Sequence, residues 1–280
     1  MTSISTSIPA FLPRRQSELH RLAMADSLAK LASGQRVNRA ADSPAGVIAA
    51  THAQAALAEL QAQMDMGQRV HNQAAVAEGA LAEISTLLTD ASALAAANAS
   101  DAGLSQAEKD ANQLQIDSIL TSVDRITSAT SFAGNKLLDG SATLSAFGQS
   151  LALGSTTTSA LGATQVDGES RTLADAATGS PLDSASGNAA GARQVIDAAL
   201  DQVSTLRGRV GAFQRYVVGV QSRNLQTASE GLSTTFSAIA DTDYAAEVAR
   251  FVRAQLLVQT TSAIVGLSQP RTGLLINLVA

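Results

Sequence analysis

Apolar residues recur at alternating spacings of three and four along two long stretches of the chain. This spacing is that of a heptad seam, along which helices pack side by side. The later stretch predicts one helix from about residue 192 to residue 240, with Asn224 at a seam position where a polar group fixes the register. The apolar positions that lead to it are Ile196, Ala199, Val203, Leu206, Val210, Phe213, Val217 and Val220.

The earlier stretch predicts a second long helix, from Val47 to about Asn98. At 1.5 Å per residue its roughly 50 residues span roughly 75–80 Å. Asp42-Ser43-Pro44 precedes it, and supplies a capping side chain followed by proline at the first helical position, where the missing N–H costs nothing. Its seam is interpreted as two runs separated by a slip: Leu57, Leu60, Met64, Gly67, His71 and Ala74, then Ala77, Leu81, Ile84, Leu88 and Ala91.

The segments between and after these stretches carry other signals. Ser105 and Glu108 form a capping-box pattern that opens a helix ending near Ser128. Residues 131–191 are rich in Gly, Ser and Thr and poor in charge, which predicts β-hairpins and turns without a core of their own. A last helix is expected between Asp243 and Pro270.

These elements predict an all-α fold of long antiparallel helices in a coiled-coil-like bundle, with a small β-hairpin excursion in the middle. Residues 44–138 and 192–240 would be the two halves of a helical rod, and 139–191 the excursion between them. Residues 1–43 and 241–280 would form a pair of terminal helical segments.

Composition narrows the function. The 280 residues are 45% hydrophobic but only 3% aromatic, so the apolar content is mostly small and aliphatic, which suits helices that approach closely. The absence of Cys excludes a disulfide framework, Cys-based metal sites and thiol catalysis. A net charge of −5 without a basic cluster argues against nucleic-acid binding. We expect no membrane insertion, and the first thirteen residues predict no conventional signal peptide.

No catalytic constellation is evident. His52 and His71 lie nineteen residues apart on one predicted helix, so they do not form a ligand pair, and no phosphate-binding glycine motif or nucleophile elbow occurs. We expect neither enzymatic activity nor a cofactor or metal. Arg36 and Asp42 flank the turn after Gly34 and allow two interpretations: a glycine stop followed by a helix cap with Arg36 in solvent, or contacts between subunits.

Several blocks in order resemble bacterial flagellins. The signature runs from Leu28 through Gly34-Gln-Arg36-Val-Asn38 to Asp42-Ser-Pro-Ala45-Gly46, and further blocks surround Glu78, Arg125, Phe132, Arg207 and Asp241. The resemblance implies roles in subunit assembly for Leu28, Leu31, Gly34, Arg36, Asn38, Asp42, Gly46, Glu78, Leu81, Arg125, Phe132, Arg207, Gln214, Asp241, Asp243, Glu247, Gln255 and Leu256.

The resemblance also implies a function. Flagellin-like chains polymerise into the extracellular flagellar filament, with paired terminal helices as the inner tube, a helical rod around it and variable outer domains inserted mid-chain. The short excursion here predicts a minimal flagellin without large outer domains. Export without a cleaved signal, junction and cap proteins as partners, and an export chaperone at the C-terminal segment are further implications. Residues 1–40 and 241–280 are expected to be disordered or loosely helical in the monomer and to fold on polymerisation.

Departures from the family pattern lead to one more hypothesis and to two alternatives. In the family pattern, flagellins recognised by an innate immune receptor have two Arg and one Glu at the positions of Asp90, Ser92 and Ala93. Because those charged groups are missing, this chain is predicted to evade the receptor. Asp42-Ser-Pro44 resembles the hook–filament junction protein, which is the first alternative. A soluble coiled-coil binding module with ordered ends is the remote second alternative.

Overall fold

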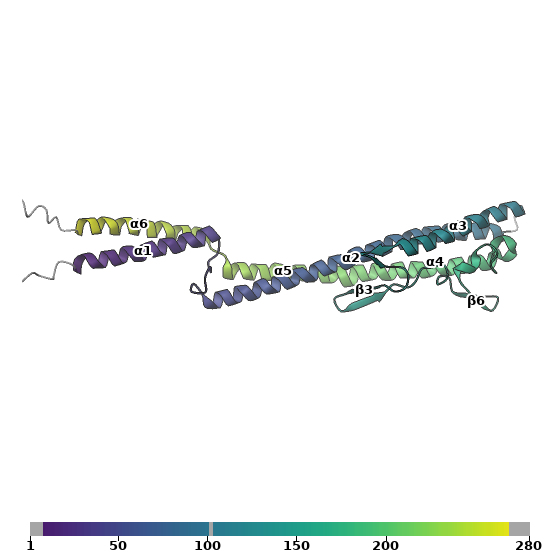
Figure 1. The fold of residues 1–280 in the computed structure, drawn as a ribbon, viewed down its shortest axis with the longest axis horizontal. Coiled ribbons are helices and arrows are strands. Elements are labelled where there is room, and N and C mark those ends of the chain that lie inside the picture. The colour runs from purple at the N-terminus through teal and green to yellow at the C-terminus, as the bar shows by residue number, and fades with distance from the viewer. Residues whose placement is uncertain (1–7, 101–102, 269–280) are drawn as a thin grey trace, which may run out of the picture. The chain divides into compact units, whose positions relative to one another are not determined.

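The computed structural model describes residues 8–100 and 103–268 (Figure 1). Residues 60–227 form one compact unit, and the described residues up to 59 and from 228 onward form another. The long helices are α1 (Ile8–Ser33), α2 (Pro44–Ala99), α3 (Gln106–Ala129), α4 (Ala189–Ala212), α5 (Gly219–Ala240) and α6 (Tyr244–Ser268). A 3₁₀ turn covers Leu173–Ala176, and π-helical turns cover Ser184–Asn188 and Phe213–Val218.

Three antiparallel hairpins make up the β structure. They pair β1 (Ser131–Phe132) with β2 (Asn135–Lys136), β3 (Thr143–Ala146) with β4 (Gln149–Ala152), and β5 (Thr164–Val166) with β6 (Glu169–Arg171). The prediction of long helices interrupted by a small β excursion is therefore confirmed. The division of the chain into the five predicted segments stays a prediction.

Helix α2 carries a seam with no slip in it. Two series of positions, each spaced by seven residues, are buried along its length. They are Gly67, Ala74, Leu81, Leu88 and Ala95, and Val70, Ala77, Ile84, Ala91 and Asn98. The predicted slip is wrong because Val70, and not His71, faces the core, and His71 is exposed.

The second predicted seam is correct as far as Phe213 and wrong beyond it. Val218 and Leu225 are buried, whereas Val220 and Asn224 are exposed. The π-turn at Phe213–Val218 is the physical reason, because its wider turn holds one more residue than a regular helix would.

The excursion shares the core of the rod. Leu144, Leu153, Leu161 and Leu173 are buried in the same apolar cluster as Leu81. Strands of two to four residues are too short to enclose a core, so the hairpins lie against the helices instead. In Figure 1, β3 and β6 lie along one side of α4.

A ladder of polar side chains on α3 fixes where the excursion lies. Asp117 accepts hydrogen bonds from the backbone N–H and hydroxyl of Thr178, and Asp124 accepts the same pair from Thr158. One turn earlier, the Gln113 side-chain carbonyl accepts bonds from the N–H and hydroxyl of Ser184, at 2.9 and 2.6 Å. The backbone N–H groups of the buried Thr158 and Ser184 and of the exposed Thr178 are thereby satisfied without a larger sheet.

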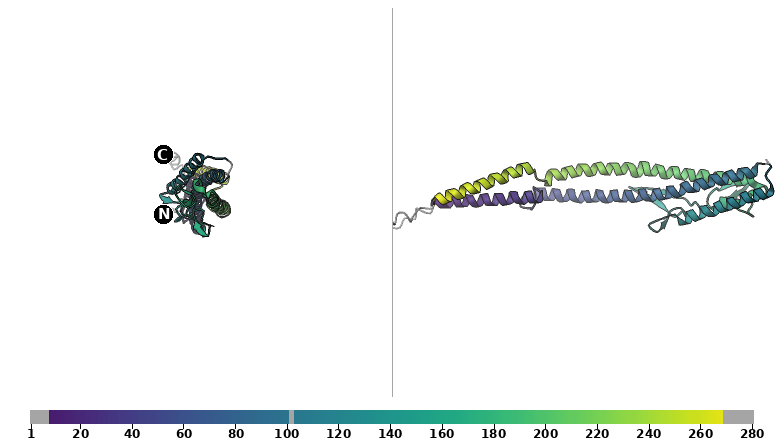
Figure 2. Two further views of the ribbon diagram at one scale, coloured as in Figure 1. Left: turned by 90° about the vertical axis from the view of Figure 1, so that its right-hand side faces the viewer. Right: turned by 90° about the horizontal axis from the view of Figure 1, so that it is seen from above.

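Helix α3 begins with the predicted capping box. The Ser105 backbone N–H donates to Glu108 Oε2 at 2.7 Å, and the Ser105 hydroxyl accepts the N–H of Glu108. The backbone and hydroxyl hydrogen bonds from Ser105 lower the pKa of the Glu108 carboxyl. The cap therefore helps to begin α3 directly after the connection from α2. The two helices run alongside each other in Figure 1 and in the right-hand view of Figure 2.

Over the described residues, α2 is the one helix long and apolar enough to cross a membrane by length and composition alone. The core helix of a water-soluble protein passes the same test. The buried face of α2, from Val70 to Ala95, belongs to the apolar cluster shared with α3 and α4.

We predict that Ile84→Ala destabilises the rod by about 2–5 kcal/mol, because it leaves a cavity in a fully buried position. Urea unfolding followed by circular dichroism measures the change. Thr86→Ala, on the exposed side of the same turn, is the matched control and should shift stability by no more than about 0.5 kcal/mol. Equal effects of the two substitutions would contradict the assigned seam.

Candidate functional site

The segment that connects α1 to α2 is fastened to the segment that connects α5 to α6. Gly34 ends α1 in the left-handed region at φ +71°, and its N–H donates to the Lys30 carbonyl at 2.9 Å. Its own carbonyl accepts the N–H of Thr242 at 2.9 Å. A Cβ at this position would lie 3.0 Å from the Tyr244 hydroxyl, so glycine is required for both the conformation and the close approach.

Arg36 binds the end of α5. Its backbone N–H donates to the Ala240 carbonyl at 2.7 Å, and its guanidinium Nη2 donates to the Ile239 carbonyl at 2.6 Å. The last carbonyls of a helix lack partners within the helix and carry its partial negative charge, so a cation is well placed there. Arg36 therefore combines an exposed side chain with contacts inside the chain, and its part in contacts between subunits stays a prediction.

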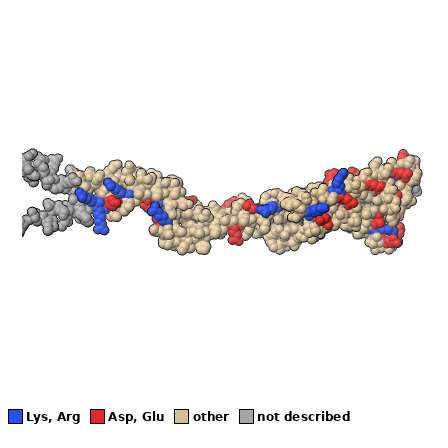
Figure 3. Space-filling model, in the orientation of Figure 1, with Lys and Arg blue, Asp and Glu red and all other residues tan. Residues whose placement is uncertain are grey.

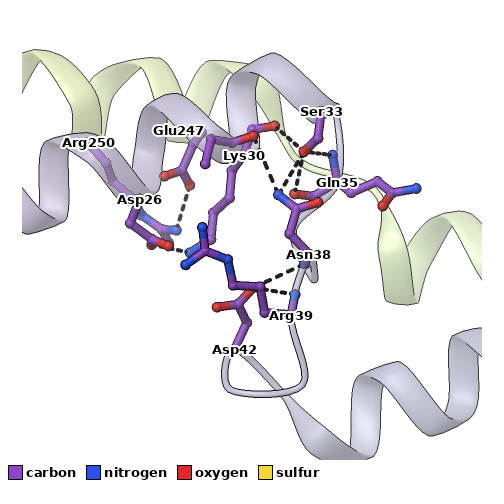
Figure 4. Close-up of polar contacts among 10 residues, drawn as sticks. Asp26, Lys30, Ser33, Gln35, Asn38, Arg39, Asp42, Glu247 and Arg250 are labelled. Atoms are coloured by element: carbon purple, nitrogen blue, oxygen red, sulfur yellow. Dashed lines mark hydrogen bonds and ion pairs between the residues drawn. The ribbon is translucent and has the colours of Figure 1, made fainter.

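Asp42 organises the loop itself, as Figure 4 shows. Its carboxylate accepts the backbone N–H groups of Asn38 and Arg39 at 3.0 and 2.9 Å. The Asn38 side-chain amide donates to the Ser33 hydroxyl at 2.8 Å and so ties the loop back to α1. The predicted site residues Gly34, Arg36, Asn38 and Asp42 are thus brought together in one hydrogen-bonded corner.

The structure shows which side chain of the predicted Asp42-Ser43-Pro44 cap is used: Ser43 caps α2. Its hydroxyl accepts the N–H of Gly46 at 3.0 Å, with Pro44 at the first helical position. A Cβ at Gly46 would lie 2.7 Å from the Ser43 hydroxyl oxygen, so this close approach needs glycine at position 46. The signal was present in the sequence, as a serine directly before a proline.

The start of α6 completes the corner. Asp243 accepts the N–H of Ala246 at 3.1 Å as a helix cap, and Asp241 accepts the Ser237 hydroxyl at 2.6 Å. Glu247 is buried and pairs with Arg250 at 3.0 Å, while on α1 Lys30 pairs with Asp26 at 2.6 Å (Figure 4). The buried Glu247 lies against α1, which packs along α6.

The paired helices α1 and α6 leave nine large apolar side chains uncovered, which together we call the terminal apolar surface. Two predicted assembly residues, Leu28 and Leu256, belong to it and are 55% and 56% exposed. Leu31 is half-buried and Gln255 is exposed. The other members of the terminal apolar surface are Leu12, Leu19, Leu22, Val248, Val252, Leu257 and Ile264. Exposed apolar surface beyond scattered single residues is typical of sites of protein association.

The predicted site residues of the rod have more varied surroundings. Arg207 pairs with Glu78 at 3.1 Å and joins α4 to α2, and Gln214 donates to the His71 carbonyl at 3.4 Å. Leu81 is fully buried in the core. Arg125 is exposed and donates to the Ser122 hydroxyl, and Phe132 is half-buried in β1.

The predicted receptor-site positions lie on α2. Asp90 and Ala93 are exposed, and the Ser92 hydroxyl donates to Asp197 of α4 at 2.6 Å. On the face of residues 60–227 drawn in Figure 3, basic and acidic side chains are interspersed among uncharged ones. Residues 8–100 and 103–268 hold no group of three or more His, Asp or Glu side chains that could bind a metal ion.

A seam-packed rod whose two terminal helices expose apolar surface defines the class of the protein: a structural subunit that completes its packing by association. Two family models match the chain, the bacterial flagellin N-terminal helical region over residues 4–143 and the bacterial flagellin C-terminal helical region over residues 193–278. The chain belongs to the bacterial flagellin family.

Three relatives match this chain over most of their own length. The flagellin of Halalkalibacterium halodurans is 28% identical over 93% of this chain and 93% of its own length. The flagellar filament 30.7 kDa core protein of Treponema maltophilum is 27% identical over 85% of each chain, and the flagellin of Bacillus subtilis is 25% identical over 85% of this chain and 86% of its own. The chain is therefore a short flagellin and a structural subunit of the extracellular flagellar filament, and the junction-protein alternative is not favoured.

We predict that Arg36→Ala destabilises the corner by about 0.5–1.5 kcal/mol, because the Ile239 carbonyl loses its charged donor while the backbone N–H at position 36 still binds the Ala240 carbonyl. Hydrogen exchange of the amides in the last turn of α5 measures the local loss. Arg39→Ala removes the same charge from the same loop but keeps the N–H that Asp42 accepts, and should leave exchange unchanged. Equal exchange in Arg36→Ala and the native chain would refute the contact.

Proposed function

We propose that this flagellin polymerises through α1 and α6, which line the inner tube of the filament and bury the terminal apolar surface between neighbouring subunits. In this proposal residues 1–43 and 241–280 are the core segments, 44–138 and 192–240 form the rod, and 139–191 replaces the outer domains. Residues 1–7 and 269–280 of the core segments lie outside the described residues.

One observation carries the proposal: α1 and α6 pack on each other and still leave leucines of both helices more than half exposed. Burial of apolar surface is worth about 25 cal/mol per Å². Nine side chains of the terminal apolar surface therefore gain several kcal/mol per subunit if neighbouring copies cover them. A helix pair left uncovered gains none of this.

The corner around Gly34 and Arg36 has a defined part in this mechanism. Its hydrogen bonds connect the loop after α1 to the ends of α5 and α6. The end of α1 and the start of α6 are thereby held side by side, so that the two terminal helices extend from this corner as a pair. Assembly then needs to cover one surface instead of two independent helices.

Order in the terminal helices is part of the same proposal. We expect residues 1–40 and 241–280 to be disordered or loosely helical in the isolated monomer and to become fully ordered when neighbouring subunits cover them. Export of the unfolded ends without a cleaved signal, an export chaperone at the C-terminal segment, and junction and cap proteins at the filament ends complete the proposal. The family membership supports these partners.

We predict that Leu28→Gln and Leu256→Gln each raise the concentration needed for seeded filament growth at least about tenfold, as expected if each substitution costs about 1.4 kcal/mol at the subunit contact. Both side chains are exposed in the monomer, so its unfolding midpoint should not change. Sedimentation of polymer and negative-stain electron microscopy measure assembly.

Leu114→Gln is the control, because it removes an equally exposed leucine from α3, outside the terminal apolar surface. Normal growth by Leu256→Gln would refute the proposal. Short rings in place of filaments from the native chain would instead favour the junction protein. Trypsin cleavage after Arg14 and Arg253 in the monomer, with protection in the polymer, is the expected sign of ordering on assembly.

We further propose that this flagellin evades the innate receptor that recognises related flagellins. The support is the exposed Asp90 and Ala93 and the engaged Ser92 hydroxyl, in place of charged groups able to form paired hydrogen bonds.

The triple variant Asp90→Arg, Ser92→Arg, Ala93→Glu should gain at least about tenfold in receptor-reporter response over the native monomer, if the restored charge pairs contribute about 1.4 kcal/mol. Exchange of the exposed Asp110 for Arg on α3 controls for added charge. A strong response to the native monomer would overturn the proposal, and so would a variant that stays silent while remaining folded.

A further inference from the structure

The helical run from Ala189 to Ala240 contains a π-turn at Phe213–Val218, between α4 and α5. Its signature bond is the Gly219 N–H, which donates to the Gln214 carbonyl five residues earlier rather than four. Such turns hold one residue more than a regular helical turn and are concentrated at positions with a function.

The buried positions before and after the π-turn belong to two different heptad series. Before it, Ile196, Val203 and Val210 are buried at a spacing of seven. After it, Val218 and Leu225 are buried and Leu232 and Ile239 are half-buried, again at a spacing of seven. The step from Val210 to Val218 is eight. One residue therefore separates the two series, and the π-turn lies where it has to be accommodated.

The neighbouring helix has no matching irregularity. Within residues 60–227, α2 keeps the seven-residue spacing without a break from the half-buried Leu60 through the buried Gly67, which lies near Ser222 of α5, to the buried Ala95. The extra residue therefore belongs to the C-terminal half of the rod alone. In a continuous α-helix one residue turns the chain by about 100°, so without the π-turn the seam would pass through Val217 and Asn224, and Leu225 would point away from it.

Local chemistry favours the π-turn at this place. A Cβ at Gly219 would lie 3.2 Å from the Gln214 carbonyl oxygen, a contact that glycine avoids. The residue pushed outward is Tyr216, which is 65% exposed, with the Arg215 guanidinium 5.5 Å from its ring centroid. Valines occupy 217, 218 and 220, so apolar side chains lie on both sides of the extra residue.

We propose that the π-turn is a register adjuster. The π-turn accommodates one residue beyond those of the two heptad series. Removal of one residue there would convert the π-turn into regular α-helix and leave the seam on either side in place. The C-terminal half of the rod is then tolerant to a one-residue change at Phe213–Val218 and intolerant elsewhere. This inference concerns the folded monomer and does not depend on how the chain polymerises.

Deletion of Tyr216 tests the proposal. The remaining residues should form a continuous α-helix that keeps Val210, Val218 and Leu225 at a spacing of seven, so the urea midpoint should equal or exceed that of the native chain. Deletion of Ser204, an exposed residue of regular α4, should lower the midpoint strongly because Leu206, Val210 and Phe213 leave the seam. Deletion of Arg215 repeats the test without relying on the tyrosine.

The register can be read directly because the chain has no cysteine. Single substitutions Leu225→Cys and Asn224→Cys, each placed in the native chain and in the Tyr216 deletion, report exposure through their rates of thiol labelling. The position-224 thiol should react at least tenfold faster than the position-225 thiol in both backgrounds. The proposal fails if the Tyr216 and Arg215 deletions lose as much stability as the Ser204 deletion, or if the two thiols react equally fast in the Tyr216 deletion.

Discussion

Close packing of small apolar side chains at a seven-residue spacing is the constraint on which this structure depends. Ala74, Ala77, Ala91 and Ala95 are fully buried on α2 and alternate with Leu81, Ile84 and Leu88. Each alanine buries little surface, so stability comes from the number of repeats and from close contact between backbones rather than from a few large groups. A chain with 3% aromatic residues has no other way to build a core of this length. The excursion follows the same constraint, because its leucines complete the helical core instead of forming one of their own.

Polar contacts fix the register between neighbouring helices, which this uniform core determines only weakly. An alanine-rich seam resists sliding weakly, since one turn resembles the next. Glu78 with Arg207, Ser92 with Asp197 and Asn98 with Ser184 join separate segments at single points. At the ends of the helices, Gly34, Arg36 and Asp42 do the same through backbone groups that no seam residue could satisfy.

Much of this architecture could be predicted from the residues, and the failures share a cause. The limits of α2 and the capping box of α3 follow from local chemistry at Pro44 and Ser105, and the structure agrees with both. The placement of His71 and Asn224 on a seam was wrong because periodicity alone does not fix the phase of a small-residue helix. Contact with the neighbouring helices selects Val70 over His71, and the π-turn at Phe213–Val218 shifts the phase so that Leu225 is buried in place of Asn224. The contacts of Arg36 with Ile239 and Ala240 join positions about two hundred residues apart, and no local pattern encodes them.

The polar ladder on α3 has a consequence for how such a chain can vary. Thr158 and Thr178 are held by Asp124 and Asp117, and the β5–β6 hairpin lies between these two anchors. Its tip, Asp167-Gly168, is exposed, and a side chain at Gly168 would meet no neighbouring atom within 4 Å. Gly168 has φ +81°, a conformation that favours glycine, so the tip is better suited to a change in length than to a change of this residue. Two fixed anchors with an exposed turn between them separate the part of the chain that can change in length from the helical scaffold that cannot.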